Sequence, residues 1–187
     1  MQKNKVKFNL KNVHYAKLTM GSDNIPSYGT PVAIPGAVSL SLDASGEPEN
    51  FYADGIAYFV INNNMGYSGD LELALIPDQM RQDLWGEVLQ STDKTLYELA
   101  NTEPAVFDLG FQIEGDQQNR LIWLYGCTAT RPAVGSTTIA ESKEVQTETC
   151  TITASPLSNG LVKCVTTDQT TETVRNGWFT AVYVPTI

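Results

Sequence analysis

The side chains of this chain that could carry out chemistry are one histidine, three cysteines and several pairs of carboxylates. The single histidine, His14, precludes a multi-histidine metal site, and its place in an alternating stretch beside lysines favours a surface or packed role over that of a general base. Cys127, Cys150 and Cys164 show no C-x-x-C spacing and lie in apolar or strand-like runs. This pattern is typical of reduced core cysteines rather than of a metal or redox centre.

Acidic pairs are frequent in this acidic chain, for example Glu47 with Glu49 and Asp70 with Glu72. Two carboxylates can serve as the catalytic pair of a glycosidase, but pairs in an acidic chain more often form a solvated face. The segment EGDQQN at 114–119 lacks the ligand spacing of a calcium loop and predicts a turn. The chain has no G-x-S-x-G, P-loop, dinucleotide-binding or H-E-x-x-H pattern. We therefore expect a protein that is not an enzyme and that uses no cofactor or metal.

A strand that runs directly into a helix is the clearest structural signal. Apolar and polar residues alternate from Tyr67 to Leu75, which predicts a strand with one face in the core and one in water. Pro77 ends this strand and suits the first turn of a helix, which we predict over about residues 77–90. The predicted helix has an apolar stripe that would pack against the core. It consists of residues spaced by four, namely Met80, Leu84 and Val88.

Alternating or apolar stretches predict further strands, at residues 6–15, 38–42, 51–61, 107–113, 121–129, 149–154, 161–165 and 178–184. The apolar phase shifts near Asn12, which indicates a bulge or bend. Residues 38–61 are expected to form a hairpin with a long acidic tip. The stretch 121–129 is apolar at nearly every position and needs a cover on both faces, from the helix or from another subunit. The predicted fold is mainly β, a β-sandwich or barrel-like arrangement with one flanking α-helix.

The length of 187 residues and the hydrophobic content of 42% indicate a single domain over residues 1–187. The net charge of −9 argues against affinity for a nucleic-acid backbone. Lysines concentrate before the first acid, so residues 1–20 are expected to form a basic arm, either a solvated strand or an arm on an acidic surface of its own chain or a neighbour. Residues 131–147 form a polar stretch too long for an idle loop. The sequence predicts neither a signal peptide nor a membrane-spanning segment, so we expect folding in a cytoplasm.

Five segments along the chain carry a family resemblance: AIPGAVSLSL, FYADGIAYF, NNNMGYSGDLELALIPDQMRQDLWGE, LIWLYGCTATRP and TETCTITASPLSNGLVKC. Together they resemble the major tail protein, or tail tube, family of bacteriophages with long, non-contractile tails. The resemblance implies a structural virion protein, a β-sandwich subunit with one flanking helix that assembles into stacked hexameric rings around a channel for DNA ejection. It also implies a place in the virion tail after assembly in the bacterial host cytoplasm, with tail tip, tape-measure and tail-terminator proteins as partners.

The wall of such a channel must let DNA slide without specific binding. Each lysine or arginine contact with phosphate would have to be broken as the DNA moved, whereas an acidic wall repels the polymer. The 38–61 hairpin is the candidate for part of this wall, with residues 67–76 expected to adjoin it. The acids of the hairpin are the candidate lumen-facing residues: Asp43, Glu47, Glu49 and Asp54. Residues 1–20 and 131–147 are expected to be mobile in the free subunit, because ordering them costs conformational entropy until a neighbour binds.

Two alternative functions remain open at the level of sequence. A tube subunit of a related contractile or secretion machine would share the fold and the ring but would have other partners. A carbohydrate-binding β-sandwich module is the second alternative, because Trp123, Trp178 and several tyrosines could form a platform for a sugar. The second alternative predicts a monomer.

Overall fold

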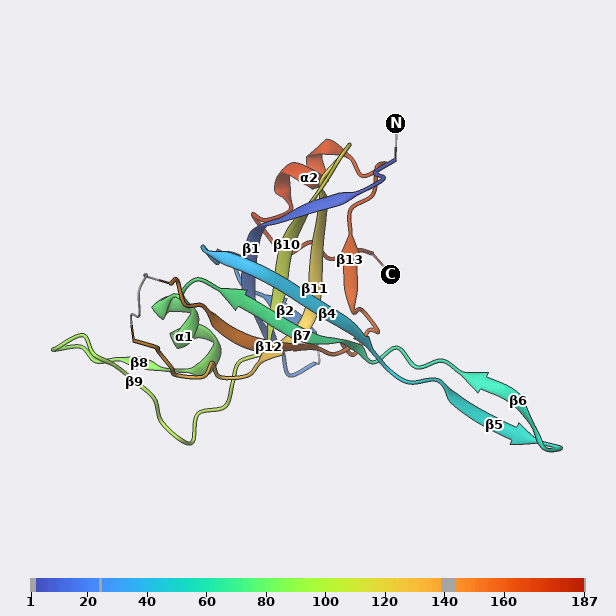
Figure 1. Cartoon of the computed structure of the whole chain (residues 1–187), viewed down its shortest axis with the longest axis horizontal. Helices are drawn as coiled ribbons and strands as arrows, with labels where there is room; N and C mark the ends of the chain where they lie inside the picture. The colour runs from blue at the N-terminus through green and yellow to red at the C-terminus, as the bar shows by residue number, and fades with distance from the viewer. Residues whose placement is uncertain (1–2, 24, 139–143, 187) are drawn as a thin grey trace.

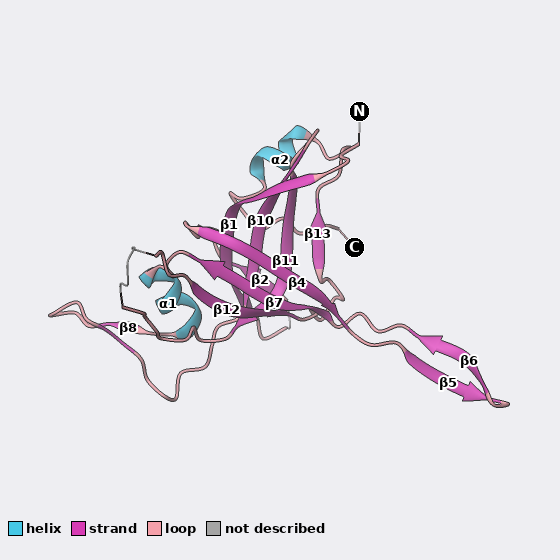
Figure 2. Cartoon of the chain, in the orientation of Figure 1, coloured by secondary structure: helices cyan, strands magenta, loops and turns pink. Residues whose placement is uncertain are grey.

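The structure is a computed structural model and describes residues 3–23, 25–138 and 144–186. The predicted fold class is confirmed, because the chain is mainly β and sandwich-like with a flanking helix (Figures 1 and 2). The strands are β1 (Lys7–Met20), β2 (Pro26–Tyr28), β3 (Val32–Ala33), β4 (Ala37–Ser45), β5 (Glu49–Ala53), β6 (Ile56–Ile61), β7 (Gly66–Leu73), β8 (Val88–Leu89), β9 (Leu96–Tyr97), β10 (Phe107–Gly115), β11 (Arg120–Ala129), β12 (Glu148–Ala154) and β13 (Lys163–Val165). The helices are α1 (Asp78–Trp85) and α2 (Glu172–Gly177).

Nine strands form one antiparallel sheet in the order β2, β1, β10, β11, β12, β7, β4, with β3 paired to β1 and β13 paired to β11. The sheet folds over within β11, whose residues 122–124 pair with β13 and whose residues 127–129 pair with β12. Gly126 lies at this point with φ +60°, and a Cβ there would approach the Ser155 carbonyl oxygen to 2.7 Å, so the bend requires glycine. Strands β12, β7 and β4 therefore cross the face of β1, β10 and β11 (Figure 1).

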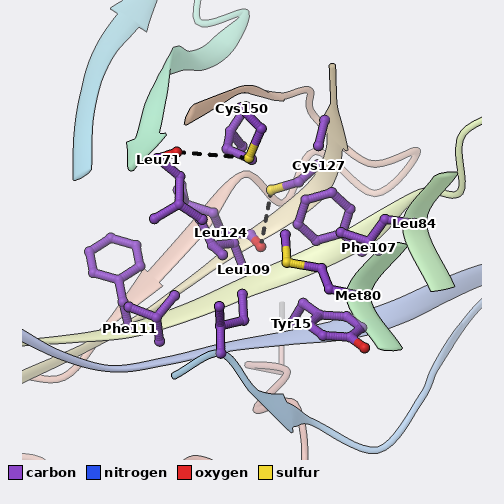
Figure 3. Packing of buried hydrophobic residues seen from close by; sticks show 14 of the residues in the cluster. Tyr15, Leu71, Met80, Leu84, Phe107, Leu109, Phe111, Leu124, Cys127 and Cys150 are labelled. Atoms are coloured by element: carbon purple, nitrogen blue, oxygen red, sulfur yellow. Dashed lines mark hydrogen bonds between the residues drawn. The ribbon is translucent and has the colours of Figure 1, made fainter. Parts of the chain in front are cut away.

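The main core fills the space between these two halves of the sheet, where Leu71 of β7 faces Leu109 and Phe111 of β10 (Figure 3). Cys127 and Cys150 lie in this core as free thiols, in agreement with the prediction that they are packed core residues. Burial raises the pKa of Cys150 to about 11 and raises the pKa of Cys127 further, so both sulfurs stay protonated at neutral pH.

Helix α1 covers one end of the core, but it is shorter than predicted. Met80 and Leu84 are fully buried, as the predicted stripe requires, and the indole N–H of Trp85 donates to the Ala129 carbonyl at 3.0 Å. The helix ends at Trp85 because Gly86 takes a left-handed conformation, with φ +65°. The assignment of Val88 to the helix stripe was therefore wrong, since Val88 lies in β8 and is exposed.

This correction predicts unequal effects of two substitutions. Leu84→Ala is expected to lower the free energy of unfolding by about 2–5 kcal/mol, because it leaves a cavity beneath α1. Val88→Ala is expected to change it by roughly 0.5 kcal/mol, as for a surface position. Urea unfolding of both variants, followed by circular dichroism, measures the difference. Equal losses would contradict the end of the helix at Trp85.

The predicted N-terminal arm is a strand of the main sheet over most of its length. Strand β1 pairs with β10 on one side and with β2 and β3 on the other, and its residues Val13, Tyr15, Ala16 and Leu18 are buried. The predicted bulge is present, since Asn12 has φ +49° and the β1–β10 register shifts beside it. Two of the three lysines of β1 contact acids of the same chain, with Lys11 Nζ 2.7 Å from Glu114 and Lys17 Nζ 2.7 Å from Asp83. Residues 7–20 are thus a paired strand of the sheet and not a free arm, residues 1–2 lie outside the described part of the chain, and the predicted mobility stays a prediction.

The C-terminal segment supplies the second cover of β11. The predicted strand at 178–184 was wrong: helix α2 precedes Trp178, and the following residues pack without strand pairing against Trp123 and Tyr125. The Trp123 indole N–H donates to the Trp178 carbonyl at 3.0 Å. Strand β11 is therefore covered on both faces by its own chain. Because both tryptophans are fully buried, they offer no exposed platform for a sugar.

Candidate assembly and channel surfaces

A long hairpin, residues 46–65, extends away from the body of the protein, and we call it the arm (Figure 1). It comprises β5 and β6, which pair only with each other among the strands of the described residues. The prediction of one returning strand over 51–61 was wrong, because the chain reverses at Asp54 and Gly55. Their φ values of +53° and +79° are those of a type I′ turn, for which Asp-Gly is a favoured sequence.

The arm exposes apolar side chains on both of its faces. Phe51 and Phe59 lie directly opposite each other on one face, and their side chains are 58% and 62% exposed. The other exposed large apolar residues of the arm are Tyr52, Ile56, Tyr58, Val60, Ile61 and Met65. A lone two-stranded hairpin is at best marginally stable in water, and a contiguous apolar surface of this kind marks an interaction site. The arm therefore has the composition of a segment that packs against a partner.

A second projection leaves the body on the side opposite the arm and contains β8 and β9 (Figure 1). It also carries exposed apolar side chains, those of Val88, Leu89, Tyr97 and Leu99. The Arg131 guanidinium forms an ion pair with Glu98 of this projection, which connects it to the predicted loop at 131–147. Residues 131–138 and 144–147 of that loop form neither helix nor strand, and residues 139–143 lie outside the described part of the chain. The predicted mobility of this loop stays a prediction.

The outer side of β4, β7 and β12 carries three rows of polar side chains, which we call the acidic face. The cross-strand rows are Ser39, Glu72 and Thr149; Ser41, Asp70 and Thr151; and Asp43, Ser68 and Thr153. Each row contains one acid, and its other members are serine or threonine. The three strands, all within the described residues, contain no lysine or arginine. All charged side chains of this face are therefore acidic, and its strands offer no cation that pairs with phosphate.

Hydrogen bonds from neighbouring hydroxyls hold the acids of this face in place. Thr147 Oγ1 and Ser39 Oγ donate to the two oxygens of Glu72 at 2.6 and 2.8 Å. Thr151 Oγ1 donates to Asp70 Oδ1 at 2.7 Å. The bonds from Thr147 and Ser39 lower the pKa of Glu72 below its ordinary value, because they stabilise the ionised form. The face therefore keeps the negative charge of Glu72 well into mildly acidic solution.

The structure separates the four candidate lumen acids into two groups. Asp43 lies on the acidic face, whereas Glu47, Glu49 and Asp54 lie exposed on the arm. Asp70 and Glu72 were interpreted from the sequence as an ordinary solvated pair, in a stretch expected to adjoin the wall, and the structure places them on the same face as Asp43. The alternation of residues 67–75 places them on the water-facing side of their strand, but only the pairing of β4 with β7 aligns them with Asp43.

No family model matches this chain, and no curated protein matches it in sequence. Among the described residues, no group of three or more His, Cys, Asp or Glu side chains is arranged to hold a metal ion. No helix formed by those residues is long and apolar enough to span a membrane. The surfaces that remain as candidates for function are the arm, the second projection and the acidic face.

Proposed function

We propose that this protein is a structural tail tube subunit of a bacteriophage, which assembles with copies of itself into stacked hexameric rings around a channel for DNA. One observation carries the proposal: the arm exposes large apolar side chains on both faces, and the body of its own chain does not cover them. A partner is needed to remove this surface from water. A second copy of the chain is the simplest partner, since it is present wherever the arm is.

Closed and stacked rings require different surfaces on one subunit. A head-to-tail contact joins one patch to a different patch on the next copy, and such contacts generate rings or filaments. The arm and the second projection lie on opposite sides of the body, so one subunit carries two different surfaces that head-to-tail contacts could use (Figure 1). The tail tip, tape-measure and tail-terminator proteins would be the partners at the ends and inside of the tube.

The acidic face supports a channel role for the proposed tube. DNA binds proteins largely through lysine and arginine contacts with phosphate, and each contact would add friction to a moving strand. A face that combines carboxylates with short hydroxyl side chains repels the DNA and offers no such contact. We therefore assign the acidic face to the channel wall, with Asp43, Asp70 and Glu72 as its charges.

Charge reversal on this face tests the channel assignment. The triple substitution Asp43→Lys, Asp70→Lys and Glu72→Lys is expected to leave tubes assembled, because these side chains do not contribute to the core. It is expected to slow DNA ejection, because each lysine adds a phosphate contact whose strength depends on salt. Ejection is measured as the rate of DNA release from virions that contain the variant subunit, at low and high ionic strength.

The matched control reverses three exposed acids elsewhere, with Glu103→Lys, Asp168→Lys and Glu172→Lys. The control has the same net charge, so slower ejection in the acidic-face variant alone identifies the position of the charges as the cause. Ejection at the wild-type rate from particles with the reversed face would contradict its place in the channel.

A further inference from the structure

An open groove with a volume of about 490 Å³ lies between β4 and β13, where the two halves of the folded sheet separate. Its floor is apolar and comes from four strands: Leu40 and Leu42 of β4, Phe111 and Ile113 of β10, Ile122 of β11 and Val165 of β13. Leu40, Leu42, Ile113 and Val165 are only partly buried, although all of them pack against the main core. The groove is thus an uncovered edge of the core.

Two unpaired strand edges border this groove. Within the described residues, β4 pairs only with β7, and β13 pairs only with β11. Each strand therefore presents backbone N–H and C=O groups that another strand can pair with. An extended, apolar segment that enters the groove would cover the exposed leucine and isoleucine side chains and pair with these edges.

The rim of the groove is basic. Lys7, Arg120 and Lys163 line it, the lining contains no acid, and none of the three forms an ion pair within the described residues. Lys163 Nζ lies 4.3 Å from the centre of the Tyr67 ring, which keeps this charge at the rim. Such a rim favours an occupant that is acidic as well as apolar.

The arm has both properties. Besides its exposed apolar side chains, it carries Glu47, Glu49 and Asp54, and residues 46–65 include no lysine or arginine. The arm extends away from the body of its own chain, so it does not cover the groove of the same molecule (Figure 1). Each copy thus offers one acidic apolar hairpin and one basic apolar groove.

We propose that the groove receives the arm of a second copy of this chain. This inference rests on the proposed self-assembly and specifies its contact: aromatic and aliphatic side chains of the arm cover Leu42, Ile113 and Val165, while its acids pair with the basic rim. The contact is heterologous, so each subunit donates one arm and accepts another. The arm acids then belong to the subunit interface, and Asp43 alone of the four candidate lumen acids belongs to the channel.

Two variants, each defective in one half of the contact, test this proposal. In the arm-less variant, residues 46–65 are replaced by Asn-Gly, which joins Ser45 to its partner Gly66 by a favoured two-residue turn. In the groove-reversed variant, Lys7→Glu, Arg120→Glu and Lys163→Glu change the sign of the rim. Each variant alone is expected to stay monomeric, with the association constant lowered by about 100-fold or more.

Mixing the two variants provides the decisive measurement. The arm-less chain keeps a working groove and the groove-reversed chain keeps a working arm, so the mixture is expected to form a one-to-one heterodimer in light scattering. A chain with the reversed rim together with Glu47→Lys, Glu49→Lys and Asp54→Lys is expected to assemble again. A control chain with Lys3→Glu, Lys5→Glu and Lys11→Glu, three exposed lysines outside the groove lining, is expected to assemble normally.

The outcomes separate this inference from the proposed function. Suppose that the intact chain assembles. If the groove-reversed chain then assembles equally well, or if the mixture yields no heterodimer, the groove does not receive the arm, and the tube proposal still stands. Continued assembly of the arm-less chain also overturns the inference, because another segment then makes the contact. If the intact chain stays monomeric at every concentration, the proposed function fails first.

Discussion

Replacing both Phe51 and Phe59 by serine is expected to abolish self-assembly while leaving the monomer folded. The two rings lie opposite each other on one face of the arm and are mostly exposed in the single chain. Their burial in a neighbour contributes about 2–4 kcal/mol per contact, so their loss weakens each contact by about 30- to 700-fold. A tube depends on many such contacts, and the assembly therefore disappears at concentrations that suffice for the intact chain.

Sedimentation velocity over a range of concentrations measures this effect, and thermal unfolding checks the fold. The monomer is expected to lose no more than about 1 kcal/mol, since the substitution removes a single cross-strand aromatic pair. The control is the double substitution Met20→Ser and Ile25→Ser, which removes two exposed apolar side chains from another surface. Loss of assembly in both variants would point to general surface hydrophobicity rather than to the arm.

The second large effect concerns Asp108, a fully buried carboxylate beneath the bend of the sheet. Its Oδ1 accepts a hydrogen bond from the Gly126 N–H at 3.0 Å, while Oδ2 has no partner among the described residues. Desolvation raises the pKa of Asp108 to about 7, and the bond from Gly126 only partly offsets this rise. The Tyr28 hydroxyl also lacks a hydrogen-bond partner among the described residues, so it does not donate to the Asp108 carboxylate.

This burial makes the stability of the fold depend on pH. An unfolded aspartate has a pKa of about 3.9, so between about pH 4 and pH 7 the folded chain holds a proton that the unfolded chain releases. The free energy of unfolding therefore falls as the pH rises through this range, by up to about 4 kcal/mol, and levels off above it. The contribution of Asp108 to the free energy of unfolding is therefore most favourable at acidic pH. A carboxylate in a salt bridge shows the opposite pH dependence, because its pKa is lowered on folding.

Asp108→Asn is expected to remove this dependence, because asparagine stays neutral and still offers an acceptor to Gly126. Relative to the parent chain, the variant should gain about 3–4 kcal/mol in the free energy of unfolding between pH 4.5 and pH 8. Urea unfolding at both pH values measures the gain, in a background with Phe51→Ser and Phe59→Ser so that assembly does not add to stability. Parallel profiles for both chains would show that Asp108 is not protonated in the folded state.

Local patterns in the sequence predicted much of the sheet. The alternation from Tyr67 onward correctly separated the core-facing Leu71 and Leu73 from the water-facing Asp70 and Glu72. The shift of phase near Asn12 correctly indicated a bulge. These features depend on residues a few positions apart, which is the range over which side-chain alternation and backbone conformation act.

The errors arose where the structure depends on one backbone conformation or on distant pairing. The left-handed Gly86 ends α1 at Trp85, five residues before the predicted end at residue 90, and the Asp54–Gly55 turn was overlooked within an apolar run. Strand β1 joins β10 about 100 residues away, and the C-terminal segment covers β11. Long-range contacts of this type leave no periodic signal in either segment, so neither the groove nor the buried Asp108 was predicted.

Electron cryo-microscopy of the purified intact chain at high concentration tests the proposed tube most directly. We predict tubes of stacked rings with a central channel, in which the face with Asp43, Asp70 and Glu72 lines the channel and the arm of each subunit contacts a neighbour. Tubes that carry this face on their outer surface, or a strictly monomeric particle at every concentration, would contradict the proposal.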